Sequence, residues 1–214
     1  MRHRKCIPSF PAEHLSRDSP PSDTPISGSL SLVENSSVLI FPEVGDSRVD
    51  FRVQSRYFTK EPTRFVLKYS HWTGRGVQGY PWIYAKFENR RLPSRVQGRP
   101  FWVNDRRCFI IDLGIEIPKG HYFDLVTQSL YVDEINNFKH FMAHRVDKAS
   151  DLRTVRVGAA FQDPPATVMA GFLSFDSLNP EHLVELEPVS RYGYVSFDYQ
   201  IDSATSEGFY CIYW

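Results

Sequence analysis

The chain has 214 residues and a formal net charge of zero, with 25 basic and 25 acidic side chains. Hydrophobic residues make up 42% of it and aromatic residues 14%, which supplies a sizeable core and excludes a wholly disordered protein. Zero net charge argues against a general nucleic-acid binder, which needs an overall positive field. The neutrality arises by cancellation, because residues 1–107 carry 18 Lys and Arg against 10 Asp and Glu, whereas residues 108–214 carry 7 against 15.

The first 28 residues are expected to form a flexible basic arm. They hold five prolines, many serines and few large apolar side chains, so they bury too little surface to offset the entropy of ordering. Arg2, Arg4 and Lys5 could lie on nucleic acid or on an acidic neighbouring subunit. No apolar stretch follows them, so no secretory signal is visible, and no run approaches the roughly 18 apolar residues of a membrane span. We therefore expect an intracellular (cytoplasmic) protein or a virion component.

Residues 29–214 are expected to form a single β-sandwich domain. Apolar and polar residues alternate with a period of two at 49–54, 111–117 and 195–202, which predicts strands with one buried and one wet face. Eight or more such strands with one or two short helices predict an all-β, mainly antiparallel fold of jelly-roll type.

A glycine-rich segment at residues 74–79 matches the GxGxxG pattern of dinucleotide-binding loops. Such a loop needs a helix directly behind it, whose N-terminus meets the pyrophosphate. Pro81 and its aromatic neighbours instead predict a new strand. The segment is therefore interpreted as a hairpin loop, and no cofactor is expected.

The most basic part of the chain is residues 86–107, with seven Lys and Arg against two acidic residues and aromatic side chains between them. Arginines beside aromatic rings are used both by single-stranded nucleic-acid sites and by protein interfaces. Its prolines and glycine indicate a loop. Alternatively, this loop contacts no partner and is exposed only to solvent. The residues predicted to contact a protein partner or nucleic acid are Arg90, Arg91, Arg95, Arg99, Trp102, Arg106 and Arg107.

Apolar residues recur at three- and four-residue steps between Ile135 and Val146, which predicts a short amphipathic helix over 133–148. His140 and His144 are four residues apart, the spacing of two metal ligands on one helix face. On the predicted helix both point away from the apolar stripe, so they are expected to face solvent or a partner. No third ligand is spaced to join them, so no metal site is expected.

The three cysteines are too few for a disulfide framework, although a bridge between Cys108 and Cys211 stays open. Cys108 begins an apolar strand and is expected to be a buried structural thiol. No nucleophile elbow occurs. Glu185 and Glu187 are spaced closely enough for a glycosidase pair, but nothing else indicates a catalytic cleft there, so no catalytic residue is assigned.

The charge segregation favours a non-enzymatic structural or assembly protein, such as a capsid or shell component. In that hypothesis a basic surface of one copy meets an acidic surface of another, or an anionic partner. A second hypothesis is a carbohydrate- or ligand-binding module that uses Tyr80, Trp82, Trp102 or Trp214 as stacking platforms. A third is a hydrolase of unknown class.

Overall fold

The computed structural model describes residues 30–42, 47–103, 106–135, 138–147, 151–177, 179–202, 204 and 206–214. These residues form strands and no helix. Within these ranges there is therefore no helix that could span a membrane. The strands are β1 (Leu30–Phe41), β2 (Arg48–Thr59), β3 (Thr63–Ser70), β4 (Trp82–Phe87), β5 (Arg90–Arg91), β6 (Arg95–Val103), β7 (Arg106–Ile117), β8 (Tyr122–Val132), β9 (Phe141–Val146), β10 (Thr154–Phe161), β11 (Met169–Ser174), β12 (Glu181–Glu185), β13 (Val189–Arg191), β14 (Tyr194–Asp202) and β15 (Gly208–Tyr213).

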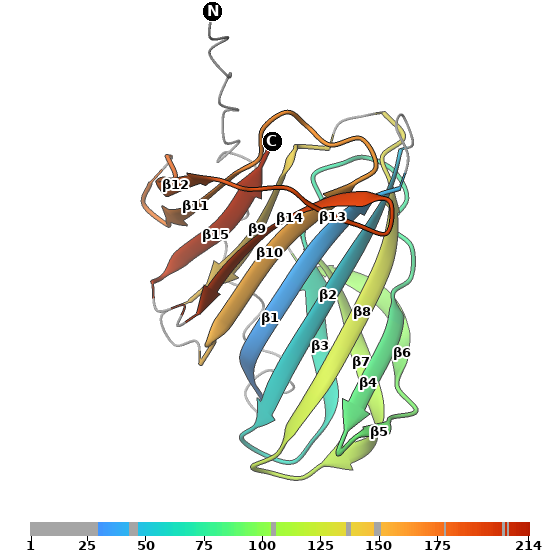
Figure 1. Cartoon of the computed structure of the whole chain (residues 1–214). Coiled ribbons are helices and arrows are strands. Elements are labelled where there is room, and N and C mark those ends of the chain that lie inside the picture. The colour runs from blue at the N-terminus through green and yellow to red at the C-terminus, as the bar shows by residue number, and fades with distance from the viewer. Residues whose placement is uncertain are drawn as a thin grey trace, which may run out of the picture.

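The strands form three sheets. The large sheet has the order β13-β14-β10-β1-β2-β8-β4-β5, a second sheet has the order β12-β11-β15-β9, and a third has β3-β7-β6. Figure 1 shows the large sheet running across the molecule, with the β12-β11-β15-β9 sheet at its upper left and the β3-β7-β6 sheet behind its lower right. Strands β1 and β10 run parallel, and the other pairs are antiparallel. The predicted all-β, mainly antiparallel, sandwich-like fold is confirmed.

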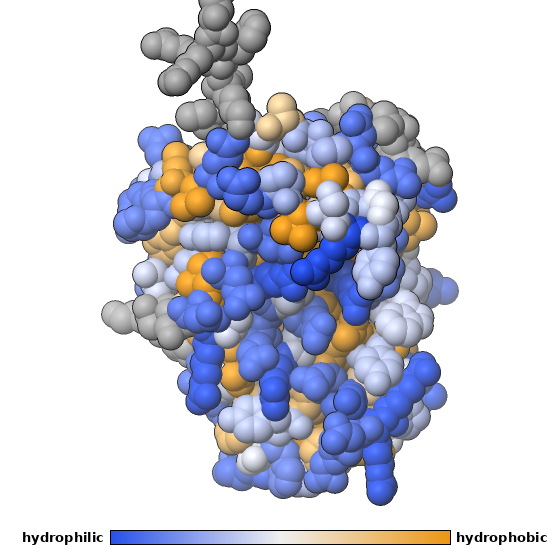
Figure 2. All heavy atoms as spheres, viewed as in Figure 1, coloured by the Kyte–Doolittle hydropathy of each residue, from blue (hydrophilic) through white to orange (hydrophobic). Residues whose placement is uncertain are grey.

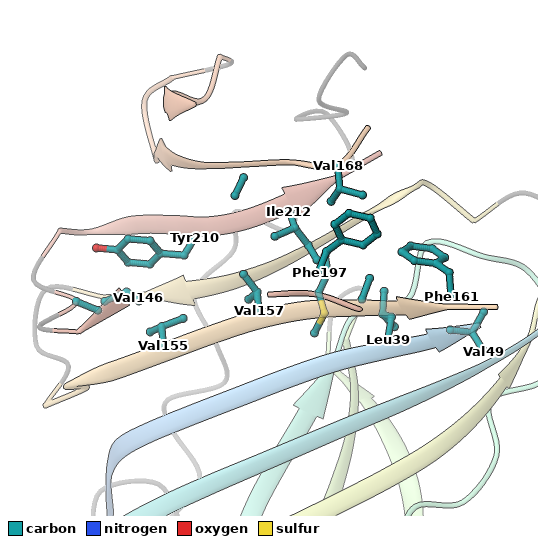
Figure 3. Packing of buried hydrophobic residues seen from close by; sticks show 14 of the residues in the cluster. Leu39, Val49, Val146, Val155, Val157, Phe161, Val168, Phe197, Tyr210 and Ile212 are labelled. Carbon is teal, nitrogen blue, oxygen red and sulfur yellow. The ribbon is translucent and has the colours of Figure 1, made fainter. Parts of the chain in front are cut away.

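One apolar cluster joins the large sheet to the β12-β11-β15-β9 sheet. Val155 and Val157 of β10 and Leu39 of β1 meet Ile212 of β15 and Val146 of β9 (Figure 3). Val155, Val157 and Ile212 are fully buried. The period of two along β10 places its odd-numbered side chains together on this inward face.

A second apolar cluster joins the large sheet to the β3-β7-β6 sheet. Tyr57 of β2 and Phe123 of β8 are cross-strand neighbours, and they pack with Val66 of β3 and with Ile111 and Leu113 of β7. The rings of Tyr57 and Phe123 stack with their centroids 5.3 Å apart. Both smaller sheets therefore cover the inward face of the large sheet.

A belt of small polar residues crosses the inward face of the large sheet between these clusters. All of its members are buried, and none belongs to either apolar cluster. The register explains why they lie together, because each belongs to the inward-pointing set of its own strand. The polar belt comprises Asn35 and Ser37 of β1, Ser55 of β2, and Thr127 and Ser129 of β8.

The helix predicted over 133–148 is wrong, because Phe141–Val146 form β9, which pairs with β15. A step of four residues returns to the same face of a strand and nearly to the same face of a helix. Met142 and Val146 would therefore share a buried face in a helix, and they do share one in the strand. His144 lies between them on that inward face, which corrects the expectation that it faces solvent or a partner.

The two halves of the chain are interleaved strand by strand, since β1 pairs with β10 and β2 with β8. Ion pairs also join the halves: Lys60 lies 2.8 Å from Asp151, and Arg64 lies 2.8 Å from Asp112. The face shown in Figure 2 is mostly hydrophilic, with small apolar patches between the polar residues. Strands of the two halves therefore lie side by side, and some of their opposite charges pair within the fold.

The glycine-rich segment 74–79 is a loop, as predicted, but it joins strands of two different sheets rather than the strands of a hairpin. It runs beside the end of β8, where Val132 N donates to Val77 O at 2.9 Å and Glu134 N donates to Arg75 O at 2.9 Å. Gly76 has a φ of +147°, and a Cβ there would lie 2.1 Å from the carbonyl oxygen of Val132. The glycine is needed for this close approach of two backbones.

Gly76→Ala is expected to lower the free energy of unfolding by about 2 kcal/mol, because the methyl group would have to displace the backbone of β8. Gly120→Ala is the control, since Gly120 also has a positive φ, +82°, but nothing lies within 4 Å of its added Cβ. Gly120→Ala should lower the free energy of unfolding by only about 1 kcal/mol. Urea unfolding measures both, and equal losses would contradict the steric explanation.

Candidate ligand-binding cavity

A cavity of about 330 Å³ lies where the three sheets meet. The polar belt residues Asn35, Ser37, Thr127 and Ser129 line one side of it, and the other sides come from strands β3, β7, β9 and β15. Its volume falls at the lower end of the range for small-molecule sites. Much of the wall is apolar, and this part includes Leu32, Leu39, Phe51, Val66, Phe109 and Met142.

Lys68 enters the cavity from β3. It shares the inward side of that strand with Val66 and Ser70, so its stem points toward the large sheet. Its Nζ donates to Ser55 Oγ at 3.0 Å and to the Tyr57 hydroxyl at 3.1 Å. The described residues offer it no carboxylate partner.

Hydrogen bonds continue from Ser55 across the polar belt to His144. Ser55 Oγ donates to Asn35 Oδ1 at 3.0 Å, and Asn35 Nδ2 lies 3.0 Å from His144 Nδ1. The amide nitrogen can only donate, so Nδ1 must accept and the ring proton resides on Nε2. The Nε2 atom is buried and has no hydrogen-bond partner among the described residues.

Burial, reinforced by the positive charge of Lys68, lowers the pKa of His144 to about 4. The imidazole is therefore neutral at pH 7, which agrees with an Nδ1 that accepts a hydrogen bond. Lys68 and His144 together supply one ammonium group and one neutral N–H donor to the same polar cluster.

Two arginines complete the charged part of the wall. Arg145 is held by Asp147, with Nε 2.8 Å from Oδ1, and its guanidinium lies over the ring of Phe175 at 4.3 Å. The guanidinium of Arg106 lies over the Tyr69 ring at 5.2 Å. No Asp or Glu is among the described residues that line the cavity. The cavity is therefore electropositive.

The predicted basic segment 86–107 is not the loop that its composition indicated, because β4, β5 and β6 and the start of β7 occupy most of it. Register shifts in β6 absorb its glycine and proline. Five of the predicted contact residues are exposed on these strands, namely Arg90, Arg91, Arg95, Arg99 and Trp102.

Arg106 and Arg107 are buried and do not belong to that exposed surface. Arg107 donates to the carbonyl of Gly79 at 2.8 Å and lies over the Tyr80 ring at 6.0 Å. A guanidinium tolerates burial when a carbonyl and aromatic faces replace its water. The other predicted contact residues, Arg2, Arg4 and Lys5, lie outside the described residues, as does the whole predicted arm 1–28.

The aromatic side chains predicted as stacking platforms are separated. Tyr80, Trp82 and Trp102 are more than half exposed. Trp214 instead packs against the first apolar cluster, and its ring stacks on that of His140 at 5.9 Å. Trp214 therefore belongs to the core. The other three are exposed, although Arg107 lies over the Tyr80 ring and Trp82 stacks on Tyr84 with the ring centroids 6.2 Å apart.

Cys108 and Cys211 are free, fully buried thiols, so the bridge left open by the sequence is not formed. Burial raises the pKa of Cys108, and it raises the pKa of Cys211 to about 12. Neither thiol is activated for nucleophilic chemistry. No group of three or more His, Cys, Asp or Glu with metal-binding geometry occurs in the described part of the chain.

In a Cys6→Ser variant, neither remaining thiol is expected to react with a disulfide reagent at pH 8 until the protein is unfolded, because both thiols are buried and protonated. Thiol titration with and without denaturant checks this. Rapid labelling in the folded protein would contradict the described packing.

No family model and no curated protein matches this chain. Among solved structures it is similar to an M1 zinc metallopeptidase from Deinococcus radiodurans, at 12% identity and a TM-score of 0.48, over 86% of this chain and 42% of that one. A mutant of that peptidase bound to a Tyr-Ser-Ala substrate gives 12% identity and a TM-score of 0.46, over 87% of this chain and 43% of that one. The chain thus spans about two fifths of these peptidases' length, and a likeness of this degree carries no information about activity.

Proposed function

We propose that this protein is a β-sandwich binding module that takes a small, partly apolar ligand into the cavity. The observation that supports this is the cavity itself, with apolar walls and a polar cluster around Lys68 and His144. This agrees with the ligand-binding hypothesis from the sequence, but the proposed binding site is the cavity rather than the exposed aromatic rings.

The polar belt gives a physical reason for this function. Small polar side chains at buried positions of a sheet contribute less to stability than apolar ones, and they leave space unfilled. Asn35 and Ser55 hold each other and their neighbours by hydrogen bonds, so the cluster is already ordered before a ligand arrives. Ordered donors beside an apolar void are the usual form of a small-molecule site.

The test is calorimetric titration of the full chain with a set of eight-carbon probes, 1-octanol, octanoate and octylammonium. At least one probe should bind, and Val53→Phe should abolish binding, because Val53 lines the cavity between its cross-strand partners Ser37 and Thr127. Ser37→Leu is a second filling variant, in case the larger ring prevents folding. Failure of all three probes to bind at millimolar concentration overturns the proposal.

A second candidate function is self-association, or binding of an anionic partner such as nucleic acid, through the exposed arginines of β5 and β6. Arg90 of β5 and Arg99 of β6 have no ion-pair partner among the described residues, and Trp102, also on β6, is 59% exposed. Light scattering should then give a mass above the monomer at low salt. Arg99→Glu should reduce this mass. Arg191→Glu, which changes an exposed arginine of β13, should not. A monomer at every salt concentration excludes self-association.

A further inference from the structure

The charges of the cavity point to the class of ligand, and this step rests on the proposed function. Lys68 brings a full positive charge to a wall that holds no carboxylate among the described residues. An ammonium group in such surroundings is stabilised by water or by an anion, whereas a cationic ligand is repelled. The site therefore favours a ligand with a negative charge.

The hydrogen-bond donors at the polar cluster indicate which ligand head group would fit the cavity. The ammonium of Lys68 has three N–H donors, of which Ser55 and Tyr57 take two. The Nε2–H of His144 is a further buried donor without a partner among the described residues. The run Lys68–Ser55–Asn35–His144 is continuous, so these two donors flank one hydrogen-bonded cluster.

A carboxylate fits this arrangement better than a phosphate does. It has a single charge and two acceptor oxygens, one for each of the two donors. Of the two arginines in the wall, Arg145 already has its own carboxylate in Asp147, and the guanidinium of Arg106 lies over the Tyr69 ring. A dianion would leave one charge without compensation in a wall that is otherwise largely apolar.

The volume limits the length of the apolar part. A cavity of about 330 Å³ lies at the lower end of the range for small-molecule sites and therefore takes only a short ligand. Leucine, valine and phenylalanine side chains form the wall beyond the polar cluster, so the tail is apolar. An aliphatic monocarboxylate with about ten non-hydrogen atoms meets both limits.

We propose that the cavity binds a medium-chain aliphatic monocarboxylate, with its head group on Lys68 Nζ and His144 Nε2 and its tail between the three sheets. Lys68 provides the charge and His144 the orientation. The polar belt holds both groups in place through Asn35 and Ser55.

The same eight-carbon probes test the ligand class on the unmodified full chain. Octanoate should bind at least about tenfold more tightly than 1-octanol, because it alone gains charge-assisted hydrogen bonds. Octylammonium should show no binding. Equal affinities of octanoate and 1-octanol would overturn the carboxylate inference while leaving the proposed function standing, whereas failure of every probe overturns both.

Variants locate the head group. Lys68→Met keeps the length of the side chain and should weaken octanoate binding roughly tenfold to hundredfold, and 1-octanol binding by a smaller factor. Lys60→Met is the matched control, because Lys60 is paired with Asp151 and does not line the cavity. His144→Phe should also weaken octanoate selectively. An unchanged preference for octanoate in Lys68→Met would overturn the assignment, and the probe comparison above needs no variant if Lys68→Met fails to fold.

Discussion

Phe123→Ala is expected to lower the free energy of unfolding by about 3–5 kcal/mol. Phe123 has the largest of the fully buried side chains, and it fills the space between the large sheet and the β3-β7-β6 sheet. Its removal would lose the transfer free energy of the ring and leave a void, because the stacked Tyr57 is held by its own strand and by Lys68. Urea unfolding followed by circular dichroism measures the loss.

Tyr192→Ala is the control for that experiment. Tyr192 is 99% exposed in the turn between β13 and β14, so its truncation should change stability by less than about 0.5 kcal/mol. A loss below about 1 kcal/mol in Phe123→Ala would contradict the second apolar cluster as described.

Asp112→Ala is expected to cost about 3 kcal/mol at pH 7, because it removes a buried carboxylate that accepts several hydrogen bonds. Arg64 donates to both oxygens, at 2.8 Å and 3.0 Å, and Gly114 N donates to Oδ1 at 2.8 Å. The Asp112 side chain is only 5% exposed, and Arg95 lies 3.8 Å away. These contacts fix β3 to β7 and hold the irregularity inside β7 at Gly114, where φ is +80°.

The effect of Asp112 should depend on pH with a definite sign. The Arg64 hydrogen bonds, opposed by burial and supported by Gly114 N–H, lower the pKa of Asp112 to about 2. A carboxylate whose folded pKa lies below its unfolded value of about 3.9 stabilises the fold above that value, and this contribution is lost as the pH falls toward 2.

The stability difference between the unmodified protein and Asp112→Ala should therefore be constant above about pH 5 and shrink between pH 4 and pH 2. Unfolding in urea across this range measures it. Glu116→Gln, an exposed change on the same strand, is the control and should leave stability nearly unchanged. A difference that stays the same down to pH 2 would contradict the ionised pair with Arg64.

The candidate site was only partly visible in the sequence. The alternation of residues in β1 could have shown that Asn35 and Ser37 are polar residues at inward positions. The role of His144 was hidden because a helix and a strand both place residues four apart on one face. Lys68 gave no signal, since a single lysine in an alternating strand is usually a solvated residue.

The sequence by itself determined the all-β class and the strands in which apolar and polar residues alternate, at 49–54, 111–117 and 195–202, because alternation is a property of neighbouring positions. The tertiary structure decided which strands pair, that the two charged halves interleave, and what lines the cavity. The contact between Asn35 and His144 spans 109 positions of the chain. Such a contact depends on the order of strands in three sheets, which local periodicity does not encode.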